Sequence, residues 1–102
     1  MKIIEKLSDM ITDELNDAEK YAKCALKYKE ERPSLAQTFY SLSLDEMKHM
    51  GMLHDETVKI INDFKAQGQE VPVEMQAVYD YLHNKQIEHA TSIKIIQETY
   101  RG

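Results

Sequence analysis

The chain has 102 residues, a formal net charge of −5 and a sequence pI near 5.3, which fits one small domain and argues against binding to nucleic-acid phosphates. A hydrophobic content of 42% with only three Gly and two Pro favours an ordered, mostly helical protein. No apolar run approaches the roughly 18 residues needed to cross a bilayer, and the lone Cys24 excludes a disulfide framework or a cysteine-based metal cluster. The first residues also lack the apolar stretch of a signal peptide, so we expect a cytoplasmic protein with no membrane partner.

The first predicted helix covers about residues 2 to 29. Its inward positions recur in alternating steps of three and four, as in a helix packed in a bundle. They are Ile4, Leu7, Ile11, Glu14, Ala18, Tyr21, Ala25 and Tyr28. Because a carboxylate in an apolar stripe needs a partner, Glu14 is a candidate functional residue.

Two further helices are predicted, over about residues 34 to 66 and 73 to 100. Pro33 separates the first two, since the residue before a proline leaves the helical region, and Gly68 ends the second. The expected inward positions of the second helix are Leu35, Phe39, Leu42, Glu46, His49, Leu53, Glu56 and Ile60. Those of the third are Met75, Tyr79, Leu82, Gln86, His89, Ile93, Ile96 and Tyr100. The short first loop predicts an antiparallel hairpin of the first two helices.

The Glu-x-x-His pair of Glu46 and His49 is the strongest motif in the chain. Residues three apart project from the same face of a helix, so one carboxylate and one imidazole can share a metal ion. Glu14 precedes the predicted turn by about 17 residues and Glu46 follows it by about 15, which predicts the same depth in the hairpin. Glu14, Glu46 and His49 are therefore predicted to converge on one metal site.

These motifs resemble those of the ferritin-like carboxylate-bridged di-iron proteins, and of rubrerythrins in particular. The segment Glu14–Tyr21 is similar to their first-helix motif, a Glu ligand with Tyr seven residues on. The segment Asp45–His49 is similar to their Glu-x-x-His motif, and the first two helices also resemble those of encapsulated ferritins. The likeness covers about residues 1 to 65. It implies an all-α, ferritin-like domain in which Glu14, Glu46 and His49 bind iron and Glu46 bridges two metal ions.

The family pattern continues with a Glu ligand about 40 residues past the His, where this chain has Glu88 followed by His89. It lacks a fourth helix, a second Glu-x-x-His and a rubredoxin-like tail. A complete site needs a Glu from each of two helices and a Glu-x-x-His from each of two others. A two-fold homodimer would supply that set from Glu14, Glu46 and His49 of both copies, and we favour it. The alternative adds Glu88 within one chain; His89 fits a hydrogen-bonded core or interface histidine better than a ligand.

The donor set predicts the metal and two classes of function. Carboxylates with a few imidazoles suit iron or manganese, although zinc can occupy such sites. The leading hypothesis is a di-iron ferroxidase or an oxidoreductase that reduces peroxide or dioxygen, in iron handling or oxidative-stress defence. The other hypothesis is a metal-free helical assembly or adaptor protein with a carboxylate in its seam. His54 and the Asp80-x-x-His83 pair are expected at the surface.

Overall fold

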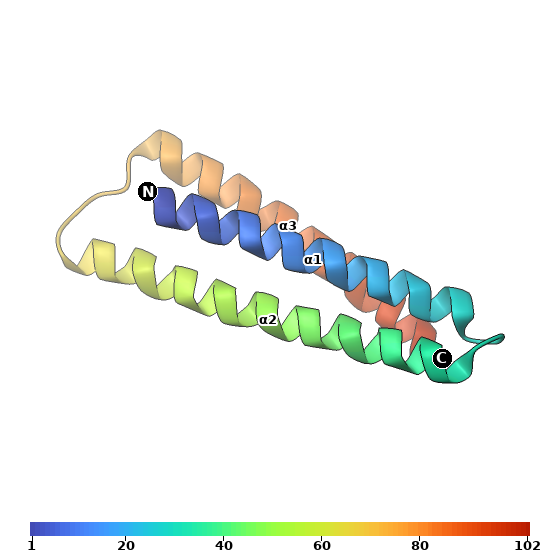
Figure 1. The fold of residues 1–102 in the computed structure, drawn as a ribbon. Coiled ribbons are helices and arrows are strands. Elements are labelled where there is room, and N and C mark those ends of the chain that lie inside the picture. The colour runs from blue at the N-terminus through green and yellow to red at the C-terminus, as the bar shows by residue number, and fades with distance from the viewer.

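The computed structural model describes all residues from 1 to 102 as three long helices and no strands. They are α1 (Lys2–Tyr28), α2 (Pro33–Ala66) and α3 (Val73–Arg101), arranged in a rod of 56 × 19 × 18 Å (Figure 1). The all-α prediction is confirmed, and each helix boundary lies within one residue of its expected place. None of the three helices combines the length and the apolar character that a membrane span requires.

Proline and glycine set the helix ends that flank the two connections. Pro33 is the first residue of α2, where its missing N–H would have had no helical partner. After Ala66, Gly68 takes a φ of +77°, a left-handed conformation that side-chain-bearing residues rarely adopt. Pro72, with a ψ of 142°, is extended and immediately precedes α3. These proline and glycine residues explain why the helix boundaries could be predicted from the sequence.

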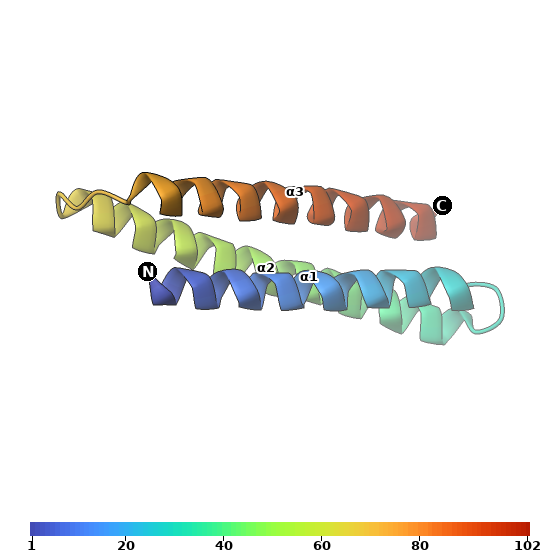
Figure 2. The same cartoon turned by 90° about the horizontal axis from the view of Figure 1, so that it is seen from above.

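The helix α1 is the centre of the bundle. It forms an antiparallel hairpin with α2, and α3 returns parallel to α1 and packs against it (Figures 1 and 2). Direct contacts between α2 and α3 are few, so α1 holds the other two helices together. The N-terminal amine of Met1 donates to the hydroxyl of Tyr79 at 2.9 Å, which ties the start of α1 to α3.

The buried core follows from this arrangement. One apolar cluster joins Ile11, Leu15 and Ala18 of α1 to Ile93 of α3. A second, near the hairpin turn, contains Ala25, Ala36 and Tyr100. The small alanine side chains of α1 let neighbouring backbones approach closely, and Ala18, Ala22 and Ala25 have no exposed surface at all.

The expected inward face of α2 is wrong in part. Leu35 and Leu42 are 42% and 36% exposed, whereas Ala36 and Ser43, each one residue further along, are fully buried. The cause is that α3 covers one flank of the hairpin. The stripe of α2 that contains Ser43 therefore faces the α1–α3 pair. The stripe containing Leu42, Glu46 and His49 borders the α1–α2 interface on the other flank. On α3, Leu82 is likewise more exposed than expected, at 36%.

Candidate metal centre

Glu14, Glu46 and His49 lie together at the middle of the α1–α2 hairpin. One ligand atom from each lies within 4.8 Å of the other two. The Nδ1 atom of His49 is 3.8 Å from Oε2 of Glu14 and 3.8 Å from Oε2 of Glu46. The predicted convergence of two carboxylates and one imidazole from two helices is therefore present in the structure.

The three side chains are buried to different extents. The side chains of Glu46 and Glu14 are 19% and 27% exposed, whereas that of His49 is 53% exposed. The Oε2 atom of Glu14 is buried and has no hydrogen-bond partner. A buried carboxylate oxygen without a donor is costly, because water no longer solvates its charge. This atom thus requires either a proton or a cation nearby.

The pKa of Glu14 is shifted by its burial beside a second carboxylate. The adjacent carboxylate of Glu46, with which a protonated Glu14 would share its proton, burial, and the negative charge of Glu46 raise the pKa of Glu14 from 4.5 to about 7, although His49 acts in the opposite direction. Two adjacent carboxylates avoid carrying two uncompensated charges by sharing one proton between them. Such a proton would also supply the donor that Glu14 Oε2 lacks. Proton and metal ion are consequently competitors for the same place.

The donor set fits a transition-metal ion. Carboxylate oxygens and imidazole nitrogens bind iron, manganese or zinc at about 2.0–2.2 Å, which requires the three ligand atoms to move about 1 Å closer together. Glu46 and His49 lie on neighbouring turns of α2 and Glu14 faces them from α1, so rotation about side-chain bonds would bring the three ligand atoms closer together. These three residues would supply only part of the ligands of such an ion, and His49 is the most exposed of them.

The other predicted site residue, Glu88, is not brought to this cluster. Its carboxylate lies 3.6 Å from Lys85 Nζ, and its side chain is 71% exposed on α3. His89 is half-buried, with Nε2 3.4 Å from Oε2 of Glu19, and it is not part of the Glu14–Glu46–His49 cluster. The within-chain completion through Glu88 is thus absent from the structure.

Two polar features of the structure were not predicted from the sequence. Ser43 donates a hydrogen bond of 2.7 Å to the carbonyl oxygen of Ala18, and Gln97 donates one of 2.9 Å to Ser43 Oγ, so all three helices meet there. His54, expected at the surface, is half-buried, and its ring stacks on that of His83. The helical periodicity could have indicated both residues, because Ser43 and His54 lie on the stripe of α2 next to the one predicted to face inward.

Comparisons with protein-family models, with curated proteins and with solved structures give no match to this chain.

Proposed function

We propose that the chain is half of a dinuclear iron centre, completed by a second copy, that oxidises ferrous iron or reduces peroxide or dioxygen. The observation that carries this proposal is the convergence of Glu14, Glu46 and His49 around a buried carboxylate oxygen with no hydrogen-bond partner. A cation at this point would remove the electrostatic cost of the paired carboxylates. Bound iron would supply the one-electron redox chemistry that no side chain provides.

A second copy is favoured by the surface around the cluster. Exposed apolar side chains follow the same stripes as the ligands, with a spacing of seven residues, or two helical turns, on each helix. They are Ile3 and Met10 on α1, and Leu35 and Leu42 on α2. Docking two such faces about a two-fold axis would bury these side chains and duplicate every ligand. The result would be a four-helix core with two Glu14, two Glu46 and two His49, the ligand arrangement of dinuclear carboxylate proteins.

The residues of this chain have separable parts in the proposed reaction. Glu46, the most enclosed of the three at 19% exposure, would be shared between two metal ions, and Glu14 and His49 would each hold one of them. Glu14 releases its proton when the cation enters, since a carboxylate binds metal in its ionised form. His49, the most exposed of the three, lies on the flank that the second copy would cover.

The test is a titration of the metal-free protein with ferrous iron under anaerobic conditions, followed by admission of air or peroxide. We expect about one iron per chain and a ferric absorption band that develops on oxidation. The variants Glu46→Ala and His49→Ala should lose both the bound iron and the ferric absorption band. Glu56→Ala is the matched control, because Glu56 lies on the same helix with a 60% exposed side chain and pairs only with Lys59.

The metal-free assembly hypothesis makes the opposite prediction for the same experiment. If Glu46→Ala and His49→Ala oxidise ferrous iron no more slowly than the unaltered protein and Glu56→Ala, the iron proposal fails. Glu14→Leu then distinguishes what remains: in a metal-free assembly it should raise stability with no loss of any metal-dependent property.

A further inference from the structure

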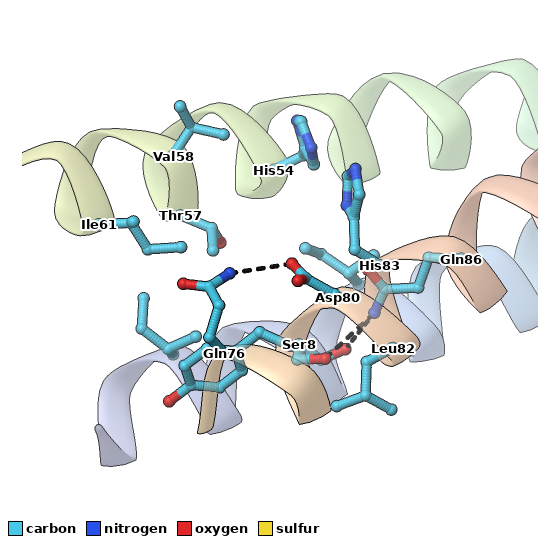
Figure 3. Close-up of a pocket in the computed structure, with 13 residues that line it drawn as sticks. Ser8, His54, Thr57, Val58, Ile61, Gln76, Asp80, Leu82, His83 and Gln86 are labelled. Carbon is cyan, nitrogen blue, oxygen red and sulfur yellow. Dashed lines mark hydrogen bonds between the residues drawn. The ribbon is translucent and has the colours of Figure 1, made fainter. Parts of the chain in front are cut away.

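We propose that His54 of α2 and His83 of α3 form a second metal site, which binds a divalent transition-metal ion with a preference for imidazole, such as Zn²⁺. The two rings face one another from different helices, with their centroids 5.1 Å apart and their planes inclined by 22°. Figure 3 shows the rings next to each other beside the pocket between α2 and α3. This site is independent of the proposed iron centre and shares no ligand with it.

The spacing of the rings fits coordination to one ion. A zinc–nitrogen bond is about 2.1 Å, and the centre of an imidazole ring lies roughly 1.1 Å beyond the bound nitrogen. Two such rings at a tetrahedral angle therefore have centroids about 5 Å apart. The structure has 5.1 Å, so the helices are already at the required separation. The near-parallel stack is not itself a coordinating geometry, so both side chains would have to reorient to aim one nitrogen each at a shared ion.

Carboxylates flank the pair on both helices. Oδ1 of Asp55 lies 3.8 Å from Nδ1 of His54, too far for a hydrogen bond but close enough to add negative charge beside the ring. Asp80 precedes His83 by one helical turn and lines the same pocket. One oxygen of Asp80 accepts a hydrogen bond of 2.9 Å from Gln76, so this carboxylate adds negative charge near the histidine pair.

The electrostatic setting suits a cation. Two pockets border the histidine pair, one of about 290 Å³ and one of about 250 Å³, and neither is lined by a lysine or an arginine. The helices α2 and α3 have few direct contacts with each other. An ion held by His54 and His83 would therefore join two helices that are otherwise linked mainly through α1.

The two proposed metal sites can be measured separately. His54 borders the pockets toward α3, whereas His49, five residues earlier, contacts the carboxylates of the α1–α2 hairpin. The variant Glu46→Ala/His49→Ala removes the first site and serves as the background for the second. Zn²⁺ is titrated into this background in competition with a chromogenic chelator, and the thermal unfolding midpoint is recorded with and without the ion.

We expect about one Zn²⁺ per chain in this background and a higher unfolding midpoint with the ion. Adding His54→Gln or His83→Gln should weaken binding by roughly tenfold or more and remove the thermal shift. His89→Gln is the control, since His89 lies on α3 but pairs with Glu19. Circular dichroism of each variant without metal verifies that the helices remain.

The proposal is overturned if the His54→Gln and His83→Gln variants bind Zn²⁺ as tightly as the background. It is also overturned if the background binds no Zn²⁺, which would leave the pair as a ring-stacking contact only. Sedimentation at several protein concentrations tests whether the ion binds within one chain or between two chains. If binding occurs only in a complex of two chains, the ion links different copies and the site between α2 and α3 of one chain is wrong.

Discussion

Ser43 Oγ on α2 donates a hydrogen bond of 2.7 Å to the main-chain oxygen of Ala18 on α1. This bond lies one turn from both Glu46 and Glu14 and fixes how far α2 is advanced along α1. Gln97 of α3 donates to the same hydroxyl, so all three helices meet at one buried polar junction. The junction is fully enclosed, because Ser43 has no exposed surface and Gln97 is only 6% exposed.

Removing this hydroxyl should destabilise the protein. In Ser43→Ala the amide of Gln97 stays buried without its acceptor, and we expect a loss of about 1–3 kcal/mol in the free energy of unfolding. Urea denaturation followed by circular dichroism measures the loss. Ser41→Ala, at an exposed position on the same helix, should change stability little. A loss in Ser43→Ala no greater than in Ser41→Ala would contradict the importance of the junction.

The stability of the metal-free protein should fall as the pH rises from about 4.5 to about 7. Glu14 has a pKa near 7 in the folded protein and an ordinary value of 4.5 when unfolded. Between these values the folded state binds more protons than the unfolded state, so raising the pH favours unfolding. Below pH 4.5 both states hold the proton, and the contribution of Glu14 is fully present.

The control for this pH dependence is Glu14→Gln, which keeps the side-chain shape but does not titrate. The difference in unfolding free energy between the variant and the unaltered protein should grow in favour of the variant across this pH range. Parallel stability curves for the two proteins would show that Glu14 does not titrate abnormally.

The uncovered flank of the hairpin should mediate self-association. Leu42→Glu introduces a charge beside the metal ligands on the face proposed to dock with a second copy. We expect a shift toward monomer in analytical ultracentrifugation and a parallel loss of iron oxidation. Val78→Glu is the control, because Val78 is an exposed apolar residue of α3, 55% accessible and remote from the ligand stripe. Self-association that Val78→Glu weakens more than Leu42→Glu would assign the interface to α3 instead.

Glu88 tests the two ways of completing the site. Because its carboxylate pairs with Lys85 on the surface of α3, Glu88→Gln should leave iron stoichiometry and oxidation rate unchanged. The measurement is the same anaerobic titration used for Glu46→Ala. A loss of iron in Glu88→Gln comparable to that in Glu46→Ala would favour a centre completed within one chain after a rearrangement of α3.

The sequence by itself determined the three helices and the level at which the three ligands meet. Helix ends are set by local chemistry at Pro33, Gly68 and Pro72, and the meeting of Glu14 with Glu46 follows from equal distances to a short turn. Both depend on short-range geometry that the residue order contains. The same arithmetic predicted the pairing of His49 with both carboxylates.

Only the tertiary structure decided which flank of the hairpin α3 covers. Adjacent stripes of α2 are both largely apolar, so periodicity alone could not distinguish the buried Ser43 stripe from the exposed Leu42 stripe. The packing of α3 against α1 made that choice, and with it placed Glu88 in solvent and His54 against His83. Side chains from different helices meet according to how whole helices pack, and that packing depends on many weak contacts that no single motif records.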